Sequence, residues 1–335
     1  MKAAFMKDVR EIVLRDVSAR SPGPQQIRLK VTACGICGTD ILAARNGEPL
    51  CKPFGHEIAG TIAELGAGVT QLEVGQKIVL DSATPCGRCA MCKNARQELC
   101  LDIQSFFFLD SFGMAEEMIA PAISAIPCED LDPAVASLQE PLGVAIDVVR
   151  VADIQPGQNV LVMGPGPIGL MAVRLIKLAG ANRIFVSALS GTTRRNALAR
   201  EFGADEVIEV DRVPLDKYRF GCDIQRVVST TPPATLPGVI PVVAKGAIIA
   251  YIGLAENEAV TMNFPANPFH FKKLQLRASF ASPALFGPQA LELLRSGRID
   301  GPRLVSHRFP LSEVRQALAL AVQDQVNTLK IVVCP

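Results

Sequence analysis

Tryptophan is absent from this chain of 335 residues, and histidine occurs only three times, at His56, His270 and His307. Chemistry that needs an imidazole, such as metal binding or proton transfer, therefore has few candidates. An excess of charge is also missing: 34 basic residues face 33 acidic ones, which argues against a nucleic-acid partner. No apolar run reaches membrane-spanning length and no internal repeat is visible, so neither a membrane partner nor a solenoid is expected.

The composition predicts a folded protein of two domains. Its length fits two domains at roughly 150 residues each, and 49% hydrophobic residues supply material for large cores. The segment Met1–Phe5 lacks the apolar core of an export signal. Ten cysteines without such a signal favour a reducing compartment and metal ligation. We therefore expect a soluble, cytoplasmic protein.

Four cysteines lie in one short run with the spacing C-x2-C-x2-C-x7-C: Cys86, Cys89, Cys92 and Cys100. The residues between them favour a tight loop over a helix or a strand. Four thiolates from one loop can complete a tetrahedral shell around one zinc ion, which leaves no open position and makes the ion structural. Two disulfides or four unrelated thiols are the alternatives, but gaps of two residues suit disulfide geometry poorly.

The pattern of the chain changes near Pro141. Before it, short β-rich runs alternate with Gly and Pro turns, as in an irregular, barrel-like β domain. After it, expected strands at 159–163, 183–187, 206–210, 224–229 and 247–252 alternate with expected helices at 168–179 and 195–202. This alternation of strands and helices predicts an α/β fold with a doubly wound parallel sheet. A helix near 288–296 and a strand near 329–333 are expected to return to the first domain.

A glycine-rich turn directly follows the first apolar strand of this second region. It reads Gly164-Pro165-Gly166-Pro167-Ile168-Gly169 and opens an amphipathic helix. In this context Gly164 permits a tight turn, Gly166 lets a pyrophosphate approach the backbone, and Gly169 lets helix and strand pack closely. Pro167 and Ile168 lie at the helix start, where they would flank the phosphates. The alternative is a Gly/Pro turn with a structural role alone.

The end of the next strand indicates which dinucleotide would bind. A carboxylate that would bind the adenosine ribose of NAD is missing at Ser187 and Ala188, and Arg194 and Arg195 follow. Loss of the acid removes repulsion toward a 2′-phosphate, and guanidinium groups bind phosphate, so NADP(H) is favoured. The alternative is a solvated arginine pair with a mixed or NAD preference. Ser229 and Thr230, at the end of a later strand, are further cofactor-binding candidates.

Two motifs upstream carry soft and borderline metal ligands. Cys37 stands in G-I-C-G-T-D and His56 in G-H-E-I-A-G, a ligand pair that suits zinc. Together with the four-cysteine run, the glycine-rich turn and the closing K-I-V of residues 330–332, these motifs resemble the zinc-dependent medium-chain dehydrogenases/reductases. That family includes the alcohol and sorbitol dehydrogenases, and the resemblance covers nearly the whole chain.

The resemblance implies an architecture. Residues 1–143 would form an irregular β-barrel-like (GroES-like) catalytic domain with a structural-zinc lobe at about 84–101. Residues 144–280 would form the dinucleotide-binding (Rossmann) domain, and residues 281–335 would return to the catalytic domain. A homodimer or homotetramer is expected from the family.

The resemblance also implies a catalytic zinc held by Cys37 and His56. Glu140, in Q-E-P-L, occupies the third ligand position of the polyol branch, and Glu57 is an alternate ligand or a partner of one. The alternatives are a surface carboxylate for Glu140 and a buried structural histidine for His56. Two zinc ions per chain are thus expected. Cys34, although it forms C-x-x-C with Cys37, is interpreted as a packing residue.

The expected activity is the interconversion of a secondary alcohol and its ketone by hydride exchange with NAD(P). The family passes the alcohol proton to the hydroxyl two residues beyond the zinc cysteine, here Thr39, and then to a histidine that Leu42 replaces. Glu140 favours a polyol, sugar alcohol or cyclitol as substrate. The alternatives are a threonine-type amino-alcohol or hydroxy-acid dehydrogenase, or a cofactor-binding relative without catalysis. The run Phe106–Phe108 could line the pocket or pack in the core.

Overall fold

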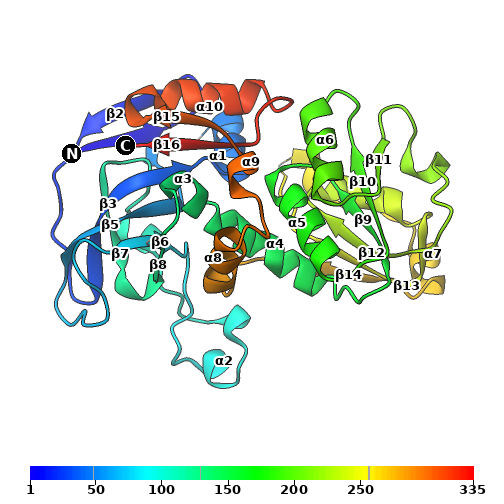
Figure 1. Cartoon of the computed structure of the whole chain (residues 1–335), viewed down its shortest axis with the longest axis horizontal. Helices are drawn as coiled ribbons and strands as arrows, with labels where there is room; N and C mark the ends of the chain where they lie inside the picture. Colours follow the sequence, from blue (N-terminus) through cyan, green and yellow to red (C-terminus); the bar gives the residue numbers. More distant parts are fainter. Residues whose placement is uncertain (48, 129, 256) are drawn as a thin grey trace. The chain divides into compact units, whose positions relative to one another are not determined.

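The chain folds into two units (Figure 1). The computed structural model describes residues 1–47, 49–128, 130–255 and 257–335. The first unit comprises Met1–Gly143 and Ala281–Pro335, and the second comprises Val144–Phe280. Both ends of the chain thus belong to one unit, and the second is inserted between its two segments.

The first unit is built on antiparallel β structure. Within its described residues a seven-stranded sheet has the order β15-β16-β3-β5-β6-β8, with β7 also paired to β3. These strands are β3 (Gln26–Gly35), β5 (Glu57–Leu65), β6 (Lys77–Leu80), β7 (Glu117–Pro121), β8 (Ala125–Pro127), β15 (Val305–Pro310) and β16 (Lys330–Cys334). A smaller sheet has the order β2-β1-β4, from β1 (Lys2–Met6), β2 (Ile12–Asp16) and β4 (Lys52–Pro53).

Short helices accompany these strands. They are α1 (Gly38–Asn46), α2 (Ala90–Lys93), α3 (Pro133–Ala136), α8 (Gly287–Arg295), α9 (Gly301–Leu304) and α10 (Val314–Gln323). The 3-10 turns are η1 (Gln97–Leu99), η2 (Phe106–Leu109), η3 (Ala122–Ser124) and η7 (Leu311–Glu313). Helix α10 contributes Val314, Ala317, Leu318 and Ala321 to a core that also contains alternate residues of β3, such as Ile27 and Leu29. The spacing of these helix residues is that of one apolar face, which explains why α10 packs against the sheet.

The last strand fixes where the C-terminal segment lies. Strand β16 pairs antiparallel with β3, with Val332 opposite Gly35 and Val333 opposite Cys34. The chain therefore returns to the segment that immediately precedes Cys37, and Lys330 comes with it.

The second unit is a parallel sheet of the order β11-β10-β9-β12-β13-β14. Its strands are β9 (Asn159–Met163), β10 (Arg183–Ala188), β11 (Glu206–Glu209), β12 (Ile224–Ser229), β13 (Val243–Tyr251) and β14 (Gln275–Ala278). Its helices are the main part of α4 (Gln139–Val151), α5 (Pro167–Leu178), α6 (Thr193–Phe202) and α7 (Ala266–Phe271), with 3-10 turns η4 (Leu215–Lys217), η5 (Pro233–Val239) and η6 (Asn257–Val260). This confirms the predicted doubly wound α/β fold.

Strand β9 is buried along its whole length, as a central strand covered on both faces must be. It pairs in parallel with both β10 and β12, so the strand order reverses beside it. Ligands of open parallel sheets bind outside the carboxyl ends of the strands at such a reversal. The glycine-rich turn leaves β9 at that end.

One local expectation needed correction. The cysteine run was expected to be a loop, but Ala90–Lys93 form one helical turn. Strand β3 pairs with β5 as far as Gly35, with register irregularities after Arg28 and Val31.

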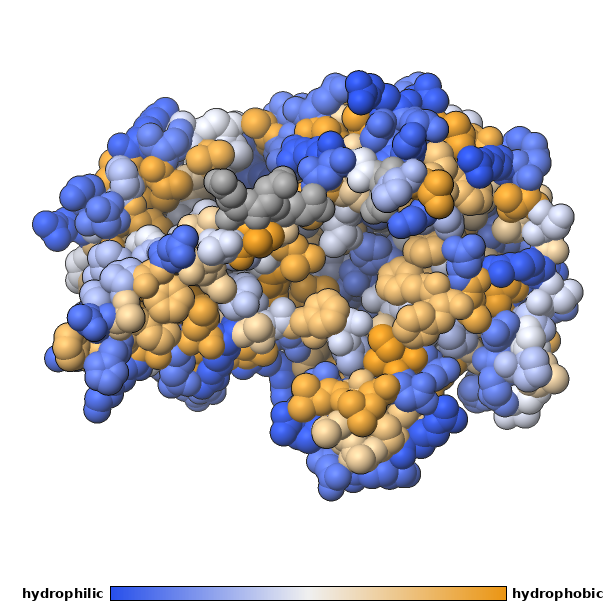
Figure 2. Space-filling model, turned by 180° about the vertical axis from the view of Figure 1, so that it is seen from behind, coloured by the Kyte–Doolittle hydropathy of each residue, from blue (hydrophilic) through white to orange (hydrophobic). Residues whose placement is uncertain are grey.

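On the face of the molecule that Figure 2 shows, apolar patches lie between polar residues. Leu101 and Phe108 are among the most exposed large apolar residues, at 72% and 71%. Every helix in the part of the chain that the structure describes is too short or too polar to cross a bilayer.

Candidate metal centres and nucleotide-binding turn

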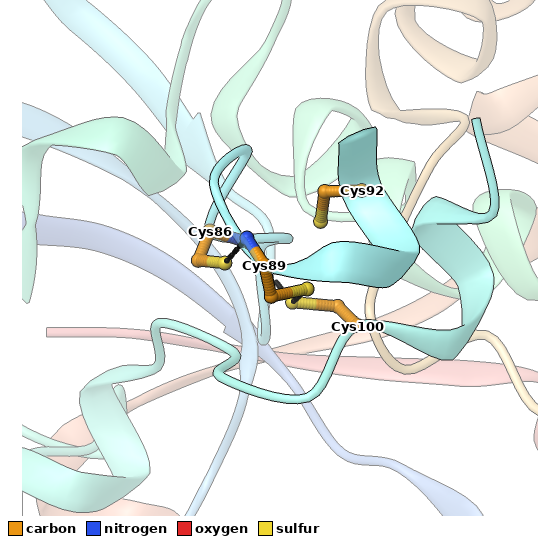
Figure 3. A group of neighbouring side chains, drawn as sticks. All are labelled: Cys86, Cys89, Cys92 and Cys100. Atoms are coloured by element: carbon orange, nitrogen blue, oxygen red, sulfur yellow. Dashed lines mark hydrogen bonds between the residues drawn. The ribbon is translucent and has the colours of Figure 1, made fainter. Parts of the chain in front are cut away.

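The four cysteines of the C-x2-C-x2-C-x7-C run come together in space (Figure 3). Cys89 immediately precedes α2 and Cys92 lies within it, while Cys100 follows η1. All four sulfur atoms lie within 4.8 Å of one another, and the Sγ atoms of Cys89 and Cys100 are 3.9 Å apart. Tetrahedral zinc with Zn–S bonds of about 2.3 Å requires sulfur atoms roughly 3.8 Å apart. None of these four described cysteines is in a disulfide.

Backbone amides stabilise the thiolate form of this cluster. The amide of Cys86 donates to Sγ of Cys100 at 3.3 Å, and the amide of Cys89 donates to Sγ of Cys86 at 3.4 Å. Hydrogen bonds from the amides of Cys92 and Leu101 lower the pKa of the Cys89 thiol to about 6. Desolvation raises the pKa of Cys92 in the same cluster. The sulfur geometry and the amide donors therefore fit zinc.

A second group of polar residues gathers where β3, β5, α1 and α4 approach one another. Cys37 is the N-cap of α1, and its amide donates to Oδ2 of the buried Asp40 at 2.9 Å. The His56 imidazole, directly before β5, interacts with the Cys37 side chain, which raises the pKa of the imidazole. Glu57 opens β5 and Glu140 lies in the first turn of α4. This group is thus assembled from segments far apart in the sequence.

The electrostatics of this group are dominated by acidic side chains. Burial raises the pKa of Glu140 to about 7, an effect opposed by His56 and reinforced by Glu57. Burial of His56 disfavours its charged form, but Cys37, with Asp40 and Glu140, raises the pKa of the imidazole well above its usual value. Burial also raises the pKa of Asp40. Such a concentration of anionic groups around one imidazole suits a bound cation.

One buried atom of this group has no partner. Oε1 of Glu57 accepts from Nζ of Lys330 at 2.6 Å, and the same ammonium donates to the Ile36 carbonyl at 3.0 Å. Oε2 of Glu57 is buried and lacks a hydrogen-bond partner among the described residues. A Cβ at Gly35 would lie 2.0 Å from this oxygen, so only glycine leaves room for it. An orphaned buried carboxylate oxygen next to a Cys–His pair fits an electropositive ligand.

The second group is looser than the first. Among the residues described, the four cysteines are the one group of three or more ligating side chains that is close enough to hold a metal ion, with ligand atoms within 4.8 Å of one another. Cys37, His56 and Glu140 are neighbours but do not form so tight a set. The Glu140 carboxylate accepts instead from Ser82 Oγ, at 3.4 Å.

Sequence reasoning missed several residues around this group. Lys330 was noted only as part of the K-I-V motif, and Asp40 only as part of G-I-C-G-T-D. The spacing of Asp40, three residues after the N-cap Cys37, is that of a capping box and could have indicated its role. Phe107 contacts the His56 ring edge-on, with centroids 6.0 Å apart, whereas Phe106 is fully buried in the core. The core interpretation thus holds for Phe106, and the lining of a pocket by Phe107 stays a prediction.

The glycine-rich turn occupies the carboxyl end of β9. Gly164 has a φ of +92°, and a Cβ there would meet the side chains of Thr230 and Thr231 at 2.9 Å. A Cβ at Gly169 would lie 1.9 Å from the Gly164 carbonyl oxygen, so helix α5 and the turn can pack only through glycine. A Cβ at Gly166 would meet no described atom within 4 Å. The backbone above Gly166, the N-cap of α5, is therefore open to an anion, which fits a pyrophosphate.

The other cofactor candidates have different surroundings. Ser187 and Ala188 end β10 and are buried, and the Ser187 carbonyl accepts from the Gly164 amide at 3.0 Å. Ser229 is buried, and Thr230 Oγ1 donates to the carbonyls of Met163 and Gly164, so it braces the turn.

Pro167, Ile168, Arg194 and Arg195 lie at helix starts. The first two open α5 and the two arginines lie in the first turn of α6. Cationic groups at this place after β10 are suited to a cofactor phosphate.

Comparison with known proteins gives a consistent result for both units. The alcohol dehydrogenase GroES-like domain matches residues 23–130, and the zinc-binding dehydrogenase domain matches residues 167–296. Sorbitol dehydrogenase of Bacillus subtilis (strain 168) is 31% identical, over 100% of this chain and 97% of its own length. L-threonine 3-dehydrogenase of Thermococcus kodakarensis is 32% identical, over 88% of this chain and 87% of its own.

A solved structure agrees with this assignment. It is a candidate zinc-binding dehydrogenase from Sinorhizobium meliloti 1021, bound to NADP, with a TM-score of 0.88 and 27% identity. The match covers 100% of this chain and 99% of the other. With a GroES-like and a Rossmann-type domain in one chain and full-length similarity to such enzymes, the protein belongs to the zinc-dependent medium-chain dehydrogenase/reductase family, the oxidoreductases that resemble alcohol and sorbitol dehydrogenases.

Proposed function

We propose that the protein is a zinc-dependent NAD(P) oxidoreductase that interconverts a secondary alcohol of a polyol, sugar alcohol or cyclitol and its ketone. The observation that supports this most is the group of Cys37, His56 and Glu140 beside the orphaned oxygen of Glu57. The first unit would be the catalytic domain and the second the dinucleotide-binding domain. The thiol ligands suit a reducing, cytoplasmic compartment, and a homodimer or homotetramer is the expected assembly.

In this proposal Cys37, His56 and Glu140 hold the catalytic zinc, with Glu57 as an alternate ligand. Three protein ligands leave one position for substrate. When bound, zinc supplies a Lewis acid that makes an alcohol far more acidic or polarises a ketone, and NAD(P) exchanges the hydride. The chain contributes the orientation of the ligands: the Asp40–Cys37 hydrogen bond holds the start of α1, and Lys330 holds Glu57. The second zinc, bound by the four cysteines, is structural.

The proton of the alcohol has a carrier next to the zinc cysteine. Thr39 lies two residues after Cys37, on the first turn of α1, and is exposed. Its hydroxyl can accept the proton and pass it on. Leu42 has no titratable group, so water or a cofactor ribose hydroxyl must complete the path from Thr39 to solvent.

NADP(H) is the favoured cofactor in this proposal. The end of β10, at Ser187 and Ala188, offers no carboxylate, and Arg194 and Arg195 follow in the first turn of α6. The NADP bound to the similar protein of S. meliloti also supports this choice.

The substrate class follows from the third ligand. Glu140 is a carboxylate where simple alcohol dehydrogenases have a cysteine, which suits a substrate with several hydroxyls. The similarity to sorbitol dehydrogenase supports this, whereas the similarity to L-threonine 3-dehydrogenase supports an amino-alcohol substrate as the second candidate.

A rate panel tests the proposal. Initial rates of nicotinamide reduction are measured on zinc-loaded protein with sorbitol and other polyols, cyclitols, simple alcohols and L-threonine, each with NAD and with NADP. Fastest turnover of a polyol with NADP is expected. Turnover of L-threonine alone would favour the second candidate. Absence of turnover across the panel, in protein with two zinc ions per chain, would contradict the proposed activity.

A further inference from the structure

Strand β10 does not end in a carboxylate, but a carboxylate that follows the neighbouring strand β11 lies close to the end of β10. Asp211 follows β11, and both of its oxygens accept hydrogen bonds from Ser190, two residues beyond the end of β10. The Ser190 amide donates to Oδ1 at 2.8 Å, and Ser190 Oγ donates to Oδ2 at 2.6 Å. Ala188 pairs in parallel with Glu209, so Asp211 and Ser190, each two residues further along, lie side by side.

The place of this contact matters because of what the fold binds there. In a doubly wound sheet the residue about 20 positions after the glycine turn contacts the ribose 2′-oxygen, and residues just beyond it contact a 2′-phosphate. In this chain Ala188 is at that position and Ser190 lies just beyond it. A backbone amide and a hydroxyl on one residue form a donor pair for a phosphate oxygen. Both donors are held by Asp211.

The loop keeps its shape by other contacts as well. The Leu189 carbonyl accepts from Thr192 Oγ1 at 2.8 Å and from Asn196 Nδ2 at 3.1 Å. Asn196 is buried in α6, which anchors this side of the loop. The charge of Asp211 can therefore be removed while the loop remains held from the other side.

We propose that Asp211 is a specificity-determining residue for the cofactor: its carboxylate competes with a 2′-phosphate for the two donors of Ser190. It lowers the affinity for the phosphorylated cofactor and leaves the affinity for the unphosphorylated one unchanged. A phosphomonoester carries about −1.5 to −2 charges at pH 7, so a carboxylate on the same donors repels it. Arg194 and Arg195 attract the 2′-phosphate, whereas Asp211 repels it. The preference between NADP and NAD therefore depends on the arginine pair and on Asp211 together. This inference rests on the proposed function, because it concerns the cofactor of that reaction.

The test is a binding measurement that needs no turnover. Wild-type protein and Asp211→Asn are titrated calorimetrically with 2′,5′-ADP and with 5′-AMP. Asparagine keeps an oxygen for the Ser190 amide but carries no charge. We expect Asp211→Asn to bind 2′,5′-ADP about tenfold more tightly, with the affinity for 5′-AMP unchanged within about twofold. Asp216→Asn removes an equal charge from an exposed residue that pairs with Lys217, and should leave both affinities as they are.

A second variant tests whether Ser190 donates to the 2′-phosphate. In the background of Asp211→Asn, the further change Ser190→Ala removes the hydroxyl donor and keeps the amide, so it should reduce the gain for 2′,5′-ADP. Equal changes for both nucleotides, or none, in Asp211→Asn would overturn the inference while leaving the proposed function intact. If neither nucleotide binds wild-type protein, the proposed function fails and the inference fails with it.

Discussion

The two candidate zinc centres differ in how the chain assembles them. The four cysteines of the lobe lie within residues 86–100, and one short helix and two turns bring them together. The other centre takes Cys37 from the N-cap of α1, His56 from the residue before β5 and Glu140 from α4. Spacing alone indicates the first centre, because its ligands are local. The second depends on tertiary structure, and so do the residues that support it.

The two centres also differ in how their charged side chains are stabilised and buried. The lobe stabilises its thiolates with backbone amides near the surface, an arrangement that suits zinc. The other centre buries the Glu57–Lys330 pair, whose side chains are 1% and 5% exposed, and leaves Oε2 of Glu57 without a partner. Buried charge with an unsatisfied atom is costly and is common at functional sites. The comparison therefore predicts that the lobe contributes stability and the second centre contributes activity.

Replacing a ligand of the second centre should have the largest effect on activity. Cys37→Ser is expected to lower kcat/KM by at least about 1,000-fold, because the metal that stabilises charge on the substrate oxygen is lost. The zinc content should fall from two to one per chain, and the unfolding temperature should change little. Metal analysis and initial rates check this. Two zinc ions per chain with full activity in Cys37→Ser would remove Cys37 from the catalytic role.

Replacing a ligand of the lobe should have the opposite pattern. Cys89→Ser leaves three thiolates and should destabilise the lobe, because metal binding and local folding are coupled. Limited proteolysis should then cut within residues 84–101 first, while the catalytic zinc stays bound. The measurement removes zinc with a chelator and titrates the cysteine thiols that become exposed. If Cys89→Ser lost the zinc at Cys37 as well, the two centres would not be independent.

Lys330 tests whether the buried ion pair supports the second centre. Lys330→Met keeps the apolar stem but leaves the Glu57 carboxylate buried without its partner, which should cost about 3–5 kcal/mol of stability. The double variant Lys330→Met/Glu57→Gln should recover most of that loss, because the uncompensated charge is gone. Urea unfolding of the three proteins checks this. A single variant as stable as wild type would mean that zinc alone neutralises Glu57.

Much of the fold could be predicted from the sequence, for identifiable reasons. Strand β9 has the expected bounds, Asn159–Met163, because a short apolar run between turns is typical of a central strand buried on both faces. The helix α2 was missed because one helical turn has too few residues to show a period. The parallel sheet followed from the alternation of strands and helices, whereas its strand order comes from the structure.

The candidate sites were predictable only where their residues are local or belong to family motifs. Lys330 contacts Glu57 across 273 positions of sequence, and Asp211 contacts Ser190 across 21. Neither contact has a local pattern, since each depends on strand pairing. The structure therefore contributes partners to motifs that the sequence already marks.

Asp81 provides the smallest expected effect and a pH-dependent one. It lies directly after β6, next to the cysteine lobe, and accepts from Gln139 Nε2 at 2.7 Å, beside Glu140. Burial raises the pKa of Asp81 from 3.8 to about 6, although Gln139 opposes this. The folded state thus holds the proton that the unfolded state has already lost above pH 3.8. The contribution of Asp81 to stability is complete below pH 3.8 and declines as the pH rises to about 6.

Asp81→Asn should remove this dependence, because asparagine keeps the acceptor for Gln139 and cannot ionise. The free energy of unfolding of wild type relative to Asp81→Asn should fall by on the order of 3 kcal/mol between pH 3.5 and 7, with the steepest change between the two pKa values. Denaturant unfolding across that range, in protein with both zinc ions removed, measures it without interference from metal release. A difference that stays constant with pH would show that Asp81 is ionised in the folded state. The Asp81 carboxylate beside Glu140 would then add to the negative charge of the second centre. The two centres would therefore differ more in charge than they do with Asp81 neutral.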